Sequence, residues 1–187
     1  MTFTSDEIDH IKRTKEHLTT IFGRDSFADY PHHFHHCFLS GGAIGSILRG
    51  EVVNDYDIYF YKPPFDDIEE WAALYGDKII TMGEAYRNIG GDDGNLAKDY
   101  TIKPCITEHA TTFKNKFQYI TMHYGTPNEI RKTFDYVHCM PYYDIVGDAL
   151  YISQEQYDLN MKKILKVNCE KEVKPHRRKK FLDKGWR

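Results

Sequence analysis

The apolar residues near the start of the chain follow the spacing of an amphipathic helix. They recur at the steps that place side chains on one helical face: Ile8, Ile11, Leu18, Ile21 and Phe22. Thr4 and Glu7 have the spacing of a capping box, and Gly23 provides a stop. A helix over residues 6–22, packed on a sheet, is therefore predicted.

Further along, the pattern changes to the alternation of β-strands. Residues 105–112 and 116–123 are rich in Thr, Tyr, Ile and Phe, and the short link between them predicts a hairpin. The runs at 78–82 and 134–137 predict two more short strands. Together with the strands that flank residues 41–54, these segments predict a sheet of about five strands.

Several later segments carry the signals of helices. Two have a Ser or Thr cap followed three residues later by Glu or Gln: Thr126 with Glu129, and Ser153 with Gln156. Apolar residues at helical spacing also cover residues 65–75, before Gly76. The basic tail over 175–187 is expected to form a last helix, anchored by Phe181, Leu182 and Trp186.

These elements predict an α+β fold in a single domain over residues 1–187. A mixed, largely antiparallel sheet would carry helices on one side, with N- and C-terminal helices packed on it. The core would cover about 30–150, and a basic helical extension would cover 153–187. A chain of 187 residues is long enough for one sizeable core.

The composition indicates a folded protein of the cytoplasm. The chain is 41% hydrophobic and 28% charged, which is usual for globular domains. Its apolar runs are shorter than the ~20 residues that span a membrane, so no membrane partner is expected. The start lacks the pattern of a signal peptide, and the cysteines lack Cys-x-x-Cys spacing, so reduced thiols are expected: Cys37, Cys105, Cys139 and Cys169.

The net charge of −3 conceals an asymmetry between the tail and the rest of the chain. Residues 162–187 carry eleven Lys or Arg and three acids, a local charge of +8, which leaves −11 elsewhere. This division fits an acidic catalytic body with a basic arm for phosphates or nucleic acid. A solvated helix whose cations serve solubility fits equally well.

The segment over residues 38–60 carries the candidate chemistry. Asp55 and Asp57 are two positions apart in a predicted strand, so their carboxylates project from the same face. Two such oxygen ligands suit Mg²⁺ or Mn²⁺. Just upstream, Gly41 and Gly42 precede a short helix, where backbone amides bind phosphates. The segment therefore predicts a site for a nucleoside triphosphate.

These motifs resemble the signature of the DNA polymerase β-like nucleotidyltransferase superfamily. Its variant in the head domain of CCA-adding enzymes is similar from Gly41 to Asp57, although Gly45 and Ser46 replace an Arg-Asp pair. Residues 106–113 and 134–139 also look like small nucleotidyltransferases of large phages. The resemblance implies a minimal nucleotidyltransferase fold and the cytoplasm of a phage host.

The resemblance also implies the roles of the site residues. Asp55 and Asp57 would bind the metal of the triphosphate, and Asp135 would complete a second metal site. Asp144 is the weaker alternative to Asp135. The β- and γ-phosphates would meet the diglycine region and further basic groups. The phosphate-binding candidates are Ser40, Gly41, Gly42 and Ser46, and the basic candidates are Lys98, Lys103, Arg177 and Lys180.

The reaction implied is transfer of a nucleoside monophosphate from ATP or another nucleoside triphosphate to an acceptor hydroxyl. An RNA 3′ end, such as that of a tRNA, is the first acceptor hypothesis, with the basic tail holding its phosphates. A toxin–antitoxin-type enzyme that modifies a small molecule or a protein is the second. An inactive nucleotide- or protein-binding module on the same fold is the third.

Two other polar clusters invite a metal hypothesis. Residues 31–37 hold four histidines and a cysteine, His32 to His36 with Cys37, but zinc ligands usually come in pairs from separated segments. A polar loop is the preferred interpretation. Asp92 and Asp93, in a glycine-rich loop, are interpreted as a solvated turn.

Overall fold

A computed structural model gives the structure of the protein. It describes residues 2–23, 36–63, 73, 75–88, 90, 101–107, 109–168 and 173–187. Several expectations lie outside these ranges, including most of the helix over 65–75. The same holds for the first three histidines of the cluster, both loop aspartates and two other candidates: His32, His33, His35, Asp92, Asp93, Lys98 and Cys169.

The first helix begins and ends close to its predicted limits. α1 covers Ser5–Ile21, and Thr4 and Glu7 form the expected capping box. Leu18 and Phe22 are buried against the sheet. Capping depends on residues three positions apart, so this helix start could be predicted locally.

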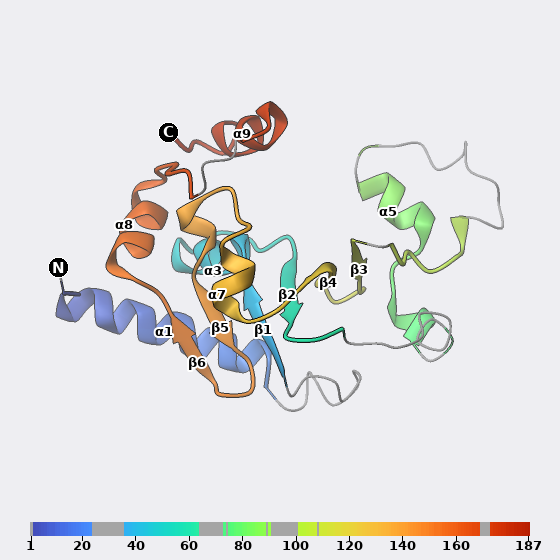
Figure 1. Cartoon of the computed structure of the whole chain (residues 1–187), viewed down its shortest axis with the longest axis horizontal. Coiled ribbons are helices and arrows are strands. Elements are labelled where there is room, and N and C mark those ends of the chain that lie inside the picture. The colour runs from blue at the N-terminus through green and yellow to red at the C-terminus, as the bar shows by residue number, and fades with distance from the viewer. Residues whose placement is uncertain are drawn as a thin grey trace.

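Among the described residues, six strands form one mixed sheet, whose arrangement can be followed in Figure 1. Their order is β3-β4-β2-β1-β5-β6; β2 and β4 are parallel, and the other neighbours are antiparallel. Their bounds are β1 Cys37–Ser40, β2 Tyr56–Phe60, β3 Ala110–Thr112, β4 Phe117–Tyr124, β5 Tyr142–Asp144 and β6 Ala149–Tyr151. The predicted hairpin is β3–β4, and the predicted α+β class is confirmed.

The other helices that the described residues form are short and lie around the sheet. They are α3 Gly42–Leu48, α5 Met82–Asn88, α7 Pro127–Arg131, α8 Gln154–Lys162 and α9 Pro175–Leu182, with 3₁₀ turns η2 Gly76–Lys78 and η4 Val137–Cys139. Both predicted capping boxes are present, at the starts of α7 and α8. In Figure 1, α9 lies at the top, α1 runs along the lower left, and α5 extends to the right beyond β3.

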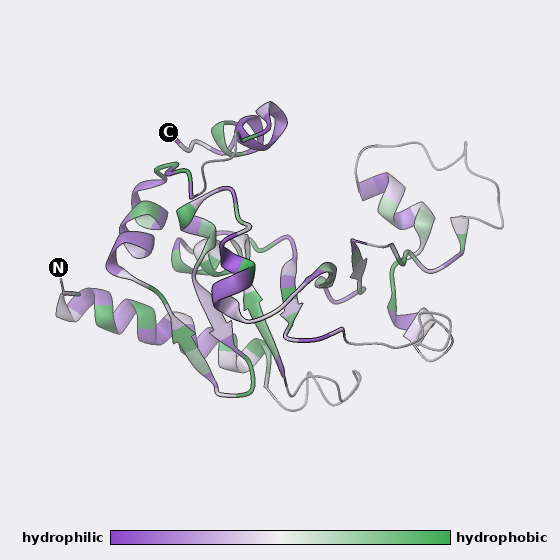
Figure 2. Cartoon of the chain, in the orientation of Figure 1, coloured by the Kyte–Doolittle hydropathy of each residue, from purple (hydrophilic) through white to green (hydrophobic). Residues whose placement is uncertain are grey.

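The core lies mainly between the sheet and the helices α1 and α3. Leu39 and Ile58 point into this larger cluster with Leu18 and Ile44. A smaller cluster on the opposite sheet face joins Phe38 and Tyr59 to Ile130 of α7. Figure 2 shows the contrast between β1, which is hydrophobic, and α9, which is mostly hydrophilic.

Two predicted strands are wrong. At 78–82 the chain forms only isolated bridges, through Ile79 and Thr81, before α5 begins. At 134–137 Tyr136 makes one bridge to Val167, and η4 begins directly afterwards. The first run divides its bridges between Phe113 and Pro104, and the second is ended by the turn of η4, so neither extends into a ladder.

Among the described residues, no helix is long and apolar enough to cross a membrane.

Candidate active site

The candidate active site lies where β1 ends in the turn into α3. Gly41, the N-cap of α3, has φ 98° and ψ −149°, a conformation that glycine alone adopts without strain. A Cβ on Gly41 would lie 2.8 Å from Oδ2 of Asp57. The carboxylate of Asp57 therefore lies against the diglycine turn, so the two motifs form one site.

Asp57 lies in β2 and Asp55 directly precedes it, and the predicted alternation holds along the strand. Ile58 and Phe60 point into the larger core. Asp57 is half-buried and Asp55 is exposed. Burial, together with the smaller effect of the negative charge of Asp55, raises the pKa of Asp57 to about 7. The pair therefore concentrates negative charge that a bound cation would stabilise.

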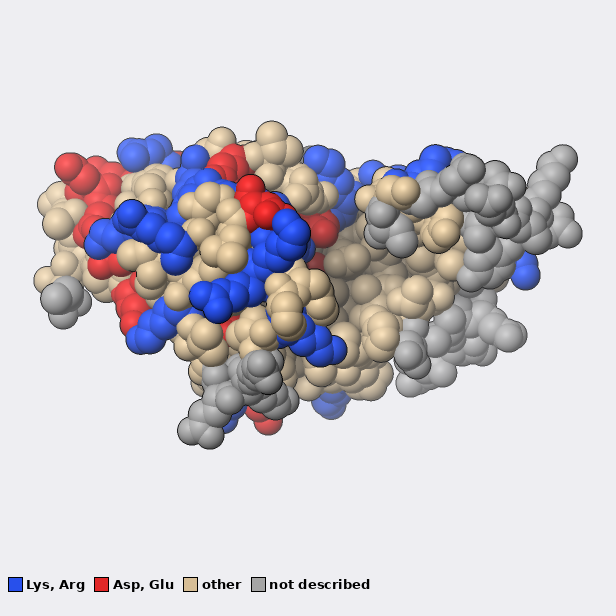
Figure 3. Space-filling view, turned by 90° about the horizontal axis from the view of Figure 1, so that it is seen from above, with Lys and Arg blue, Asp and Glu red and all other residues tan. Residues whose placement is uncertain are grey.

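Two cations of α9, Arg177 and Lys180, face this negative charge. Their charges act against the effects of burial and of Asp55 on the pKa of Asp57. Figure 3 shows basic side chains gathered over this end of the molecule, with acidic ones beside them at the edge of a hollow. Lys103 instead lies beside α5, where its carbonyl oxygen accepts a bond from the first residue of that helix.

Asp135 lies outside the sheet, in the irregular segment before η4. Nε of Arg177 donates a hydrogen bond of 2.7 Å to Oδ2 of Asp135. Within the described residues, no three His, Cys, Asp or Glu side chains are grouped to hold a metal ion. The carboxylate of Asp144 accepts bonds from the amides of Val146 and Gly147 in the β5–β6 turn. The structure thus places Asp135 with a cation of α9.

The four candidate phosphate-binding residues divide into two pairs. The hydroxyl of Ser40 donates to the carbonyl of Pro141 at 2.8 Å, and the amide of Gly41 donates to the carbonyl of Cys139 at 3.0 Å. These two hydrogen bonds join the end of β1 to the residues at and just after the end of η4. Gly42 is exposed and Ser46 is half-buried. In the described part of the chain, no group accepts a hydrogen bond from the Gly42 amide or the Ser46 hydroxyl.

A cluster of aromatic rings holds α9 near the site, and two of its members, Tyr136 and His138, were not predicted from the sequence. The ring of Trp186 lies 3.9 Å from that of His138, centroid to centroid, and the guanidinium of Arg49 lies 4.9 Å from the Trp186 ring. Phe181 meets Tyr136 and His138 edge to face. Trp186 and His138 are 5% and 2% exposed, so the tail is anchored as predicted, although Leu182 is exposed.

The imidazole of His138, which packs in this cluster, is uncharged at neutral pH. Burial, with a smaller effect from the charge of Arg49, lowers its pKa to about 3. Both ring nitrogens are buried without a hydrogen-bond partner among the described residues. Its carbonyl oxygen accepts a bond of 2.9 Å from Nδ2 of Asn160.

Asn160 connects α8 to α3 and explains one departure from the head-domain signature. Its Oδ1 accepts a bond of 2.9 Å from Nη1 of Arg49. A Cβ on Gly45 would lie 2.1 Å from the same oxygen. A larger residue at position 45 would displace this buried network. Close packing against Asn160 therefore explains the glycine at position 45. This glycine was the one feature of the sequence that pointed to the hydrogen-bond network of Asn160.

His36 is the only member of the histidine cluster that the structure describes. Its ring meets the ring of Tyr61 at a centroid distance of 6.2 Å.

Comparison with known proteins gives one family and two structural neighbours. A family model described as Gad2, Gabija anti-defense 2 family protein, matches residues 10–163. A crystal structure of the Bacillus stearothermophilus CCA-adding enzyme with CTP is 16% identical, with a TM-score of 0.43, over 72% of this chain and 29% of that one. An apo form of a CCA-adding enzyme is 13% identical, with a TM-score of 0.42, over 89% of this chain and 34% of that one.

The chain thus spans about a third of the length of these enzymes. No curated protein sequence matches it.

Proposed function

The chain belongs to the Gabija anti-defense 2 family, and we propose that it is a metal-dependent nucleotidyltransferase. It would move a nucleoside monophosphate from a nucleoside triphosphate to an acceptor hydroxyl. The acceptor oxygen bonds to the α-phosphorus as the bond from that phosphorus to the bridging oxygen breaks. Pyrophosphate leaves, and the proton of the hydroxyl passes to solvent.

The observation that carries the proposal is the contact between Asp57 and the diglycine turn. The carboxylate pair and the diglycine turn are 13 residues or more apart in sequence, yet Oδ2 of Asp57 lies 2.8 Å from the position of a Cβ on Gly41. A triphosphate and its cation need both features at one point. The sequence motifs indicated the carboxylate pair and the phosphate-binding turn separately and did not place them side by side.

Asp55 and Asp57 fit a divalent cation. Burial and the neighbouring charge of Asp55 both destabilise the ionised form of Asp57, and a cation relieves both effects. When bound, Mg²⁺ or Mn²⁺ would neutralise charge on the triphosphate and make the acceptor hydroxyl more acidic. Asp135 remains our candidate for a third carboxylate ligand, and its partner in the structure is Arg177.

The protein's own groups would bind and orient the phosphates. The Gly42 amide and the Ser46 hydroxyl lie in the first turns of α3 and would donate to phosphate oxygens. Arg177 and Lys180 would stabilise the negative charge of the leaving pyrophosphate. Catalysis would then consist of positioning and electrostatic stabilisation, with no covalent intermediate on the protein.

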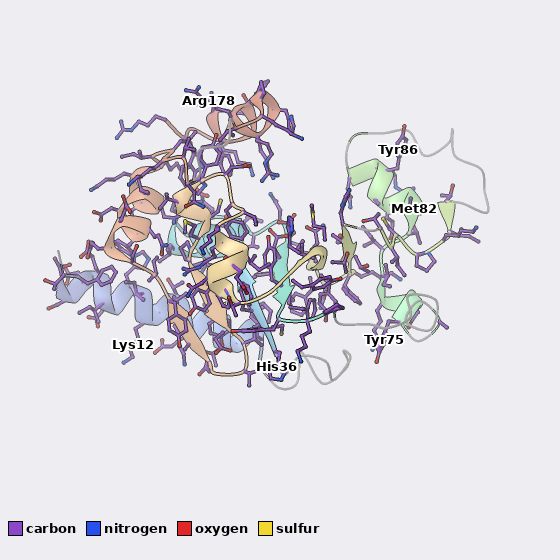
Figure 4. All side chains as sticks on the ribbon, viewed as in Figure 1. Lys12, His36, Tyr75, Met82, Tyr86 and Arg178 are labelled. Atoms are coloured by element: carbon purple, nitrogen blue, oxygen red, sulfur yellow. The ribbon has the colours of Figure 1, made fainter. Side chains whose placement is uncertain are left out.

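Two acceptors are supported by different observations. The basic tail supports an RNA 3′ end, because cations such as Arg178 project from α9 into solvent (Figure 4). The description of the family refers to an action against a defence named Gabija. It supports a hydroxyl on a component of that defence, which corresponds to the protein- or small-molecule-modifying hypothesis.

Transfer of label would test the proposal. The protein would be incubated with Mg²⁺ and each α-labelled nucleoside triphosphate, with total RNA in one reaction and purified Gabija proteins in another. We expect label on one acceptor and none with Asp55→Ala/Asp57→Ala. Asp9→Ala, which changes an exposed aspartate on α1, is the matched control and should keep full activity. Absence of both transfer and triphosphate binding would refute the enzyme and leave a protein-binding module.

A further inference from the structure

A second candidate binding site lies on the other face of the sheet from Asp57. A groove of about 560 Å³ opens between α1, the end of α3 and the start of β2. Its volume is within the range of small-molecule sites. The proposed function uses none of the residues that line it.

One wall of the groove is basic. His10, Arg13 and His17 lie three and four positions apart on α1, so they share one face of the helix. Lys116 also lines the groove, and its ammonium donates a bond of 3.1 Å to the carbonyl of Val53. Among the described residues, no carboxylate is within ion-pair distance of Arg13. These groups lie in the part of the chain that has a net charge of −11, so the positive groove is a local exception.

Among the described residues of the lining, Glu51 alone is acidic, and it is neutralised by other partners. Glu51 accepts a bond of 2.8 Å from Nη2 of Arg49, and Nζ of Lys163 lies 2.8 Å from its other oxygen. The bond from Arg49, opposed by partial burial, lowers the pKa of Glu51 to about 2. Glu51 therefore does not cancel the positive charge of Arg13 and Lys116.

The floor of the groove is apolar and includes one aromatic ring. Ile47, Val53 and Tyr56 line it. The ring of Tyr56 meets Phe22 and Phe117 edge to face, at 6.0 and 5.8 Å. These contacts hold the ring in place, so it offers a preordered surface for a planar group.

We propose that this groove binds a nucleoside phosphate, separately from the site at Asp55 and Asp57. The guanidinium of Arg13 and the ammonium of Lys116 would bind the phosphate oxygens. The base would lie on the apolar floor beside Tyr56. The ligand is either a free nucleotide or the terminal nucleotide of a single-stranded RNA.

The groove and the active site are adjacent but separate. Val53 and Tyr56 flank Asp55 in the sequence and line the groove, whereas Asp57 projects from the other face of β2. Binding in the groove requires no divalent cation, because its phosphate-binding groups are cationic side chains. Nucleotide binding measured without metal therefore tests the groove independently of the proposed nucleotidyltransferase reaction.

The test measures binding in EDTA and 0.1 M salt on the Asp55→Ala/Asp57→Ala background. The probes are labelled ATP and a 5′-labelled single-stranded RNA of ten adenylates. We expect one site per chain, weakened at least about tenfold by Arg13→Glu/Lys116→Glu. Lys12→Glu is the matched control, because Lys12 is exposed on α1 and points away from the body of the protein (Figure 4). It should change the affinity by less than about twofold.

Each outcome bears on the proposal. Binding of ATP identifies a free nucleotide as ligand, and binding of the RNA alone identifies a strand end. Binding of neither probe at millimolar concentration would overturn the proposal. An equal loss of affinity with Lys12→Glu would also overturn it, because the effect would then be one of net charge. Circular dichroism of each variant would establish that it is folded.

Discussion

The adjacent glycines of the diglycine turn should respond in opposite ways to substitution by alanine. Gly41→Ala places a side chain at φ 98° and ψ −149°, which costs about 1–3 kcal/mol for a residue other than glycine. Its Cβ would also lie 2.8 Å from Oδ2 of Asp57, so the carboxylate must move. We expect a total loss of about 2–4 kcal/mol in the free energy of unfolding.

Gly42→Ala meets neither obstacle. A Cβ on Gly42 has no heavy atom within 4 Å, and alanine is favoured over glycine in a helix by about 0.5–1 kcal/mol. Thermal unfolding followed by circular dichroism would measure both variants, with Gly41→Ala lower in melting temperature by on the order of 10 °C. A Gly41→Ala variant as stable as wild type, or equal losses in both, would refute the close contact between the turn and Asp57.

The anchoring of α9 gives three further expectations, each measurable by urea unfolding. Trp186→Ala should cost about 3–5 kcal/mol, because its ring is 5% exposed; Lys179→Ala, which removes only an exposed ion pair with Asp183, should cost less than about 1 kcal/mol. Asn160→Ala should cost about 2–4 kcal/mol, because it leaves a buried carbonyl without its donor; a loss below 1 kcal/mol would contradict the network. Burial lowers the pKa of His138 from 6.5 to about 3, so below pH 6.5 the unfolded chain binds a proton that the folded one does not. As the pH falls from about 6 to 4, His138 should therefore lower the free energy of unfolding by about 1.4 kcal/mol per pH unit. Asp57, whose pKa burial raises to about 7, acts in the opposite sense over this range, so we expect the difference in stability between the wild type and His138→Phe to change by this amount.

The features that could be predicted from the sequence are those set by residues close together in the chain. The capping boxes at Thr4, Thr126 and Ser153 join residues three positions apart, and all three helices begin there. The alternation along this strand correctly placed Ile58 in the core, with Asp57 on the opposite face of β2.

Short strands could not be predicted, because their existence depends on distant partners. Tyr136 pairs only with Val167, and residues 78–82 make only the isolated bridges from Ile79 to Phe113 and from Thr81 to Pro104, so neither run becomes a strand. β6 forms because it pairs with β5 through a tight turn.

The arrangement of side chains around the candidate active site could not be predicted from the sequence either. The bond from Arg177 to Asp135 joins residues 42 positions apart, and no local pattern indicates it. His138 and Trp186 meet only because the tail folds back, where the amide of Arg187 donates to the carbonyl of Lys163 at 3.0 Å. The sequence suggested four basic candidates for binding the triphosphate. Of these, Arg177 and Lys180 lie near Asp57 in the structure.

The central claim is that Asp55 and Asp57 hold the cation of a nucleoside triphosphate at the diglycine turn. A crystal structure with Mn²⁺ and a non-hydrolysable nucleoside triphosphate would test it most directly. We expect the metal between the carboxylates of Asp55 and Asp57, with the triphosphate against Gly42 and near Arg177. A metal bound elsewhere, or a triphosphate that does not contact the turn, would contradict the proposed function.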